Sequence, residues 1–96
     1  MINSKSSYTL LLTGGTGTFG EEFVNIILKD KKLKKLIIFS RDEMKQWHMQ
    51  KKYTDKRIRF LIGDIRDENR LLMATKDVDY VFHAAAMKIV ETAEYN

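Results

Sequence analysis

The sequence predicts an α/β fold, with a doubly wound parallel sheet of about four strands and flanking helices. Short apolar runs alternate with longer amphipathic segments, glycines directly follow two of the apolar runs, and no repeat or linker interrupts the alternation. Strict alternation of strand and helix implies parallel strands joined by right-handed crossovers. Ligands of such sheets bind at the carboxyl ends of the strands, so the residues that follow each strand form the candidate site.

Changes in hydrophobic period predict the individual elements. Continuous apolar runs predict strands over Tyr8–Thr13, Leu36–Phe39, Ile58–Ile62 and Tyr80–Phe82. Apolar residues at three- and four-residue spacing predict helices over Thr18–Lys29, from Ser40 to Tyr53 and over Asp67–Lys76, and residues 87–96 look like the start of a fourth helix.

The helix after the second strand is predicted in more detail. Ser40 is expected to be its N-cap, in a capping box with Glu43. Met44, Trp47 and Met49 have the spacing of a buried helix stripe, which we favour over a platform for a nucleobase.

Four strands are only the first half of a doubly wound sheet. The chain is therefore expected to be one domain over residues 1–96 that is truncated at its carboxyl-terminal side. The fourth strand would then be an exposed apolar edge, which predicts poor solubility or self-association of the chain.

Composition excludes several classes of protein. With 44% hydrophobic and 31% charged residues, no apolar run of membrane-spanning length and no secretory signal, the chain is expected to be cytoplasmic. It has no cysteine, and His48 and His83 lack ligand spacing, so we expect no metal site. Much of the net charge of +4 lies in residues 29–35, a predicted solvated loop without interleaved aromatic residues, so no nucleic-acid partner is expected.

A glycine-rich segment follows the first strand. It contains Gly15-x-Gly17-x-x-Gly20 and also the wider spacing Gly14, Gly17, Gly20. A pyrophosphate must lie against backbone N–H groups at a helix N-terminus, where a Cβ would obstruct it. A tight strand-to-helix turn without a ligand is the alternative, but the position between a buried strand and an amphipathic helix favours a Rossmann-type NAD(P)-binding domain.

The end of the second strand carries positive charge. Arg41 stands where NAD-binding proteins usually have an acid, and Lys45 follows one turn later. A guanidinium suits a 2′-phosphate, so NADP is favoured as cofactor. Asp42 leaves NAD open, and both basic side chains could instead point into solvent.

The third and fourth strand ends are less specific. Asp64, after Gly63, could accept from an adenine amino group or be a turn residue. His83 is expected to be a packed core residue, and the three alanines that follow it could let the backbone approach a cofactor or could serve helix packing. Lys88 is by default a surface lysine within reach of the same site.

Taken together, the strings TGGTGTFG, IIFSRDEMKQ, RFLIGDIRD, VFHAAAMK and AEYN resemble one family. They are similar to the N-terminal part of the extended short-chain dehydrogenase/reductases that act as UDP-N-acetylglucosamine 4,6-dehydratases. The resemblance runs from Leu10 to Asn96. It implies a cofactor site made of Gly14, Thr16, Gly17, Thr18, Phe19 and Gly20 at the pyrophosphate, Ser40, Arg41, Asp42 and Lys45 at the ribose and 2′-phosphate, Asp64 and Ile65 at the adenine, and Ala84, Ala85 and Lys88 further along, with Lys88 also near the sugar nucleotide.

The resemblance also implies a function. The chain would be the NADP-binding part of an NADP-dependent lyase that acts on a UDP-sugar in bacterial polysaccharide or surface-glycan biosynthesis and is a homo-oligomer when full length. That chemistry needs a Tyr-x-x-x-Lys pair, and none of the four tyrosines has a lysine four positions later. We therefore expect no catalytic residue in this chain, and no activity from it alone.

Two other functions fit the same residues. One is a different extended short-chain dehydrogenase/reductase, such as a nucleotide-sugar epimerase or reductase, because this half of the fold carries cofactor chemistry and little substrate chemistry. The other is a non-catalytic domain that binds or senses NADP.

Overall fold

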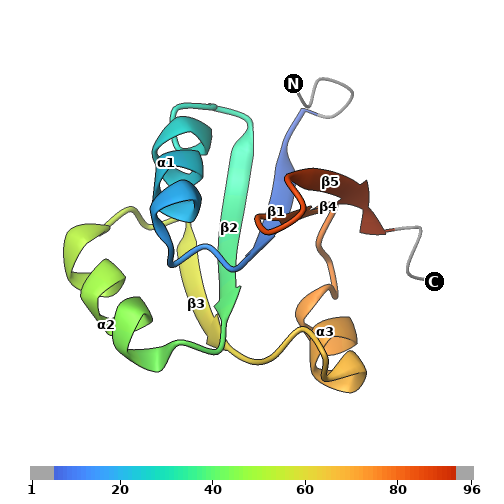
Figure 1. Cartoon of the computed structure of the whole chain (residues 1–96). Helices are drawn as coiled ribbons and strands as arrows, with labels where there is room; N and C mark the ends of the chain where they lie inside the picture. Colours follow the sequence, from blue (N-terminus) through green and yellow to red (C-terminus); the bar gives the residue numbers. More distant parts are fainter. Residues whose placement is uncertain (1–5, 93–96) are drawn as a thin grey trace.

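A mostly parallel sheet with helices on both faces forms the chain, whose computed structural model describes residues 6–92 (Figure 1). The strands are β1 (Tyr8–Thr13), β2 (Leu33–Ser40), β3 (Ile58–Ile62), β4 (Tyr80–His83) and β5 (Lys88–Glu91). The helices are α1 (Thr18–Ile27), α2 (Glu43–Lys52) and α3 (Glu68–Ala74). The predicted α/β Rossmann-type fold is confirmed.

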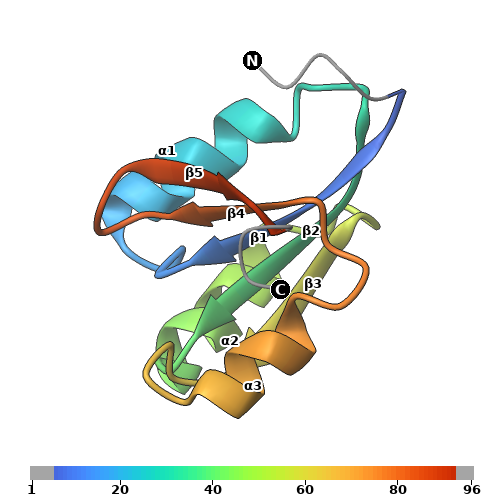
Figure 2. The same ribbon diagram turned by 90° about the vertical axis from the view of Figure 1, so that its right-hand side faces the viewer.

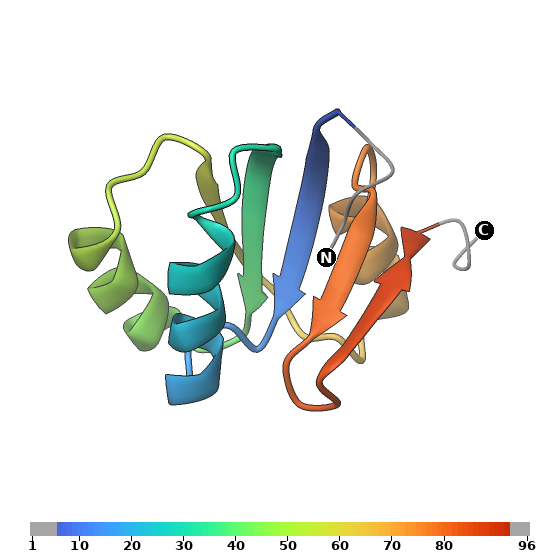
Figure 3. The same ribbon diagram turned by 90° about the horizontal axis from the view of Figure 1, so that it is seen from above.

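The strand order is β3-β2-β1-β4-β5. β1 lies at the centre, hydrogen-bonded to β2 and β4, and β1 to β4 all run parallel, as the alternation predicts. Helices α1 and α2 cover one face of the sheet and α3 the other (Figure 3). The carboxyl ends of four parallel strands consequently lie at one edge, which is where a ligand is expected.

The fifth strand corrects the prediction of a fourth helix. Residues 88–91 form β5, which runs antiparallel to β4 with His83 opposite Lys88, and residues 93–96 lie outside the described part of the chain. Met87 has a φ of 50° and closes the turn, and the β-branched Ile89 and Val90 suit a strand. The expected exposed edge at β4 was wrong for the same reason, because β5 is the outer strand (Figure 2).

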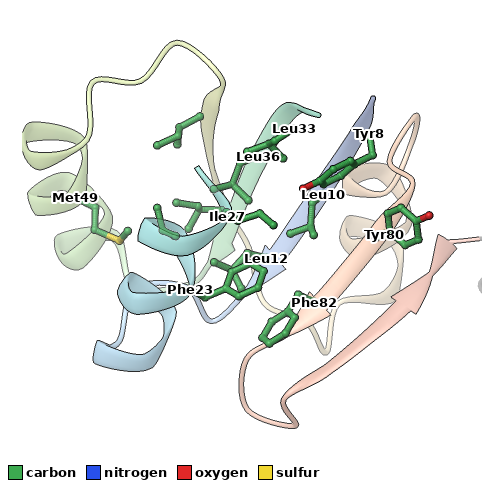
Figure 4. Close-up of a cluster of buried hydrophobic side chains, with 13 residues drawn as sticks. Tyr8, Leu10, Leu12, Phe23, Ile27, Leu33, Leu36, Met49, Tyr80 and Phe82 are labelled. Atoms are coloured by element: carbon green, nitrogen blue, oxygen red, sulfur yellow. The ribbon is translucent and has the colours of Figure 1, made fainter. Parts of the chain in front are cut away.

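The larger core lies under α1 and α2 (Figure 4). Phe23 of α1 stacks on Phe82 of β4 with ring centroids 4.2 Å apart, and Tyr8 meets the edge of Tyr80 at 6.0 Å. A smaller cluster on the α3 face is built from Leu11, Phe39, Ala74, Val78 and Val81. Every residue of β1 is buried, which explains its three successive leucines and its lack of a charged residue.

Helix α2 is oriented differently from the predicted buried stripe. Met49 is buried as expected, but Met44 is 66% and Trp47 51% exposed. The second buried residue is Gln46, whose Nε2 donates to the backbone carbonyl of Leu61 at 3.0 Å and to that of Ser40 at 3.2 Å. These hydrogen bonds set the rotation of the helix, and a polar residue cannot be found by hydrophobic spacing.

Two further boundaries differ from the sequence predictions. Asp42, not Ser40, is the N-cap of α2, since its carboxylate accepts from the Lys45 amide at 3.0 Å. The predicted lysine loop is shorter than expected, because β2 begins at Leu33, which is 3% exposed, and includes Lys34. Within residues 6–92, no helix has the length and apolar character needed to cross a membrane.

Candidate functional site

The four parallel strands end at a continuous, hydrogen-bonded edge. The amides of Gly14, Gly63 and Ala84 each donate to a carbonyl of the neighbouring strand, at 3.0, 3.0 and 3.2 Å. The three loops that leave this edge therefore start from fixed positions.

The glycine loop requires glycine for two separate reasons. Gly14 has a φ of 70°, a left-handed conformation that side chains disfavour. Gly20, in the first turn of α1, packs against the backbone of Gly15 so closely that a Cβ would lie 2.5 Å from three of its atoms. Helix and loop thus touch directly, as the predicted packing role of Gly20 requires.

The N-terminus of α1 differs from those of the other two helices. Asp42 caps α2 and Asp67 caps α3, each accepting from a backbone amide. The N-cap of α1 is Gly17, which offers no side-chain acceptor, and a Cβ at Gly17 would meet nothing within 4 Å. The first turn of α1 thus has no side-chain cap and leaves space beside Gly17 at the positive end of the helix dipole, an arrangement that suits a phosphate.

A first pocket, of about 390 Å³, lies over the ends of β1, β2 and β3, and we call it the strand-end pocket. It brings together seven of the predicted cofactor residues, Gly14, Ser40, Arg41, Asp42, Asp64, Ile65 and Ala85. Thr13, Phe39, Gly63 and Arg66 complete its lining.

The charged groups of the strand-end pocket centre on Asp64. Arg66 donates to this carboxylate from Nη2 at 2.7 Å, and Arg41 from Nη1 at 3.4 Å. The hydrogen bonds from Arg66, with the charge of Arg41 as the smallest cause, hold the pKa of Asp64 below its usual range. Asp64 is therefore an anion at neutral pH, and it can accept a hydrogen bond but not donate one.

A second pocket, of about 370 Å³, separates the start of α1 from α2, and we call it the interhelix pocket. It is lined by the predicted residues Thr16, Gly17, Thr18 and Lys45, together with Glu21, His48, Met49 and Lys52. Arg41 and Lys45, both expected at the ribose and 2′-phosphate, thus line different pockets. The pockets adjoin where the hydroxyls of Thr16 and Ser40 approach within 3.4 Å.

Four predicted residues line neither pocket. The Phe19 ring stacks on Phe82 at 6.2 Å, and Gly20 packs on the loop. Ala84 packs against the larger core, and Lys88 is exposed at the start of β5.

His83 is only partly buried and shares a 3.1 Å hydrogen bond with the Thr13 hydroxyl. Burial, and secondarily Lys88, lower the pKa of its imidazole. His83, expected to be a packed core residue, is thus a half-buried, hydrogen-bonded side chain whose ring is neutral at pH 7.

Arg66, Glu21 and Lys52 are charged pocket residues that sequence reasoning missed. Lys52 pairs with Glu21 at 2.8 Å across the interhelix pocket, joining residues 31 positions apart. Only the spacing of Arg66, two residues after Asp64 in a turn, could have signalled its contact.

The fold and the glycine loop define the class of this protein. A parallel sheet in this order, with a glycine loop at the first strand and polar groups at the next two strand ends, is the N-terminal half of a short-chain dehydrogenase/reductase. The model of the family described as "Polysaccharide biosynthesis protein" matches residues 10–96, and the chain belongs to this family.

Individual relatives agree with that assignment. The chain is 49% identical over 96 residues to a UDP-N-acetylglucosamine 4,6-dehydratase (inverting) of Campylobacter jejuni, covering 100% of this chain and 28% of that protein. It is 51% identical over 90 residues to a UDP-glucose 4-epimerase of Rickettsia bellii, covering 91% of this chain and 26% of that protein. Among solved structures, Pen from Bacillus thuringiensis matches with a TM-score of 0.78 and 43% identity over 95% of this chain and 28% of that one. The predicted family is confirmed, and the chain spans little more than a quarter of the relatives it matches.

Proposed function

We propose that this chain is the NADP-binding part of a nucleotide-sugar 4,6-dehydratase of the UDP-N-acetylglucosamine type. The relative of that name supports it with 49% identity over the full chain. The sugar substrate and the elimination chemistry would involve the remainder of a longer protein, since the described tyrosines Tyr8, Tyr53 and Tyr80 lack a lysine partner four positions on.

The glycine loop fits a dinucleotide. The open space at Gly17 leaves room for a pyrophosphate against the amides that begin α1. The strand-end pocket would hold the adenosine, with Asp64 and Ile65 beside the adenine. A bound nicotinamide would supply hydride transfer, and the residues of this chain would bind and orient it.

The position of Arg41 is the observation that favours NADP over NAD. Its guanidinium lies at the end of β2 on the strand-end pocket and is 71% exposed. Among residues 6–92, the 3.4 Å contact to Asp64 is its one ion pair. Asp42, the group that could bind ribose hydroxyls instead, already caps α2. The pocket thus offers a cation to a 2′-phosphate, while one oxygen of the alternative carboxylate already accepts the cap hydrogen bond of α2.

Lys45 and Lys88 take secondary roles in this proposal. Lys45 lies in the interhelix pocket, next to the Thr16–Ser40 contact, where it would add charge at the 2′-phosphate. Lys88, exposed at the start of β5, would meet the phosphates of the cofactor or of the sugar nucleotide.

A nucleotide-sugar epimerase is the second candidate. The relative in Rickettsia bellii named UDP-glucose 4-epimerase is 51% identical over 90 residues, so the similarity of this segment does not separate the two activities. Incubating the whole protein with UDP-N-acetylglucosamine and UDP-glucose separates them, because only a dehydratase yields a product that has lost water.

Calorimetric titration of the chain with NADP and with NAD tests the cofactor. We expect tighter binding of NADP and, in Arg41→Ala, a loss of most of this preference. Arg59→Ala removes the same charge from an exposed position on β3 outside both pockets and should leave the preference unchanged. Tighter binding of NAD, or no effect of Arg41→Ala, would contradict the proposal.

A further assay concerns the chain itself. No dehydration of the sugar nucleotide is expected from the purified 96-residue chain in the presence of NADP. Product formation by it would show that the catalytic groups lie within these residues.

A further inference from the structure

The Asp64 carboxylate is almost fully occupied by one neighbour. Arg66 approaches it from Nε at 3.1 Å to each oxygen, from Nη2 at 2.7 Å to Oδ2, and from its backbone amide at 2.9 Å to Oδ1. A carboxylate accepts about four hydrogen bonds. A second arginine can therefore gain only a poor contact.

Arg41 is that second arginine. Its Nη1 reaches only Oδ2, the oxygen that already accepts the shortest bond from Arg66, and the 3.4 Å distance exceeds that of a good charged hydrogen bond. The three groups carry a net charge of +1, and the excess charge resides on the arginine with the longer contact.

The Arg66 guanidinium lines the same pocket but is bonded to Asp64. The Arg66 side chain is 77% exposed. Arg41, at 71% exposed, donates to no other side chain among the hydrogen bonds of the described residues. The two arginines thus differ in how firmly the same carboxylate holds them.

We infer that Arg66 is a positioning residue that occupies Asp64 and thereby keeps Arg41 available for a phosphate monoester on the ribose of a dinucleotide. This inference rests on the proposed binding of NADP and adds a determinant of cofactor preference outside the second strand end. Arg66 would act through Asp64 without touching the phosphate.

Without Arg66, the Asp64 carboxylate can bind Arg41 instead. In Arg66→Ala, the Asp64 oxygens become free, and the Arg41 guanidinium, already 3.4 Å away, can form a close two-point pair with them. A 2′-phosphate must then break that pair before it binds Arg41. NAD, which has no such phosphate, does not require the pair to break.

The test compares the ratio of the NAD and NADP dissociation constants in the wild type and in three variants. Arg66→Ala should lower the preference for NADP roughly 1.5- to 5-fold, the range that corresponds to the energies measured for exposed ion pairs. The double variant Arg66→Ala/Asp64→Asn should restore it, because Arg41 then has no carboxylate partner at this position. Arg59→Ala is the matched control for the loss of one positive charge and should leave the ratio unchanged.

An equal change in both affinities in Arg66→Ala, or no rescue by the double variant, would overturn the inference. A ligand-free measurement separates it from the cofactor proposal: NMR should give one averaged set of Arg41 Nη–H signals in the wild type and separate signals in Arg66→Ala. Identical Arg41 signals in both proteins would overturn the inference even if NADP binds as proposed. Separate signals in a protein that prefers NAD would refute NADP and leave the coupling between the two arginines supported.

Discussion

Replacing Gly20 with alanine should force α1 away from the glycine loop. The added Cβ would lie 2.5 Å from the Cα, C and O atoms of Gly15, whereas ordinary contacts begin at 3.4 Å. All three atoms belong to the backbone, so no side chain can turn aside to make room. Helix and loop must separate by roughly 1 Å.

The magnitude follows from two opposing effects. Alanine is usually the better helix residue, by about 1 kcal/mol. Overpacking of a rigid contact costs about 1–3 kcal/mol, and here the upper end applies because the neighbour is backbone. A net loss of about 2 kcal/mol would lower the melting temperature of a domain of this size by roughly 10 °C.

Gly17→Ala is the matched variant, because its Cβ would meet nothing within 4 Å. It should cost no more than about 1 kcal/mol of stability, the usual penalty of alanine at an N-cap. Its Cβ would nevertheless occupy the space proposed for the pyrophosphate, so the affinity for NADP should fall at least about ten-fold.

Thermal unfolding by circular dichroism and calorimetric titration with NADP separate the two effects. Gly20→Ala should lose stability and affinity together, and Gly17→Ala mainly affinity. A Gly20→Ala chain as stable as the wild type would refute the packing argument. Normal NADP binding by Gly17→Ala would refute the placement of the pyrophosphate.

Three further changes test other parts of the structure. Gln46→Leu leaves buried carbonyls without their donor and should cost about 1–3 kcal/mol in urea unfolding, whereas the exposed Gln50→Leu should be nearly neutral. Hydrogen bonds from Arg57 lower the pKa of Asp55 to about 2, so its stabilisation is present above pH 3.8 and lost as the pH falls through about 2. Asp55→Asn should therefore be less stable than the wild type at pH 7, and in acid unfolding the difference should shrink as the pH falls through about 2 and vanish below it. The pKa of His83 is lowered from 6.5, so the contribution of its neutral ring to folding stability is complete above pH 6.5 and is lost at lower pH. In His83→Asn, the free energy of unfolding should therefore depend less on pH below 6.5. An unchanged slope in His83→Asn would contradict the assignment.

The central strands could be predicted because burial on both faces leaves a continuous apolar run. β1 is the clearest case, and its order beside β2 and β4 follows from the alternation of elements. β5 could not be predicted, because Lys88–Glu91 has only two apolar residues and exists through pairing with β4. A pairing of that kind is a tertiary effect without a local signal.

Some features of the candidate site could likewise be predicted from the sequence, and others could not. Chain order places Gly14, Arg41 and Asp64 at strand ends, and the structure brings all three to one pocket. The occupation of Asp64 by Arg66 depends on the conformation of a turn, and the separation of Lys45 from Arg41 depends on where α2 begins. Residue type and spacing do not specify either.

The hydrogen bonds of Gln46 also bear on binding kinetics. One amide group joins the last carbonyl of β2 to a carbonyl near the end of β3, beneath the two loops that supply Arg41 and Asp64. The ends of β2 and β3, from which the two loops start, are thus anchored to the same helix. The backbone at these strand ends therefore loses its conformational entropy during folding and not on ligand binding. A nucleotide entering there would find a preorganised surface, and its association rate should be governed by encounter and desolvation and not by the ordering of a loop.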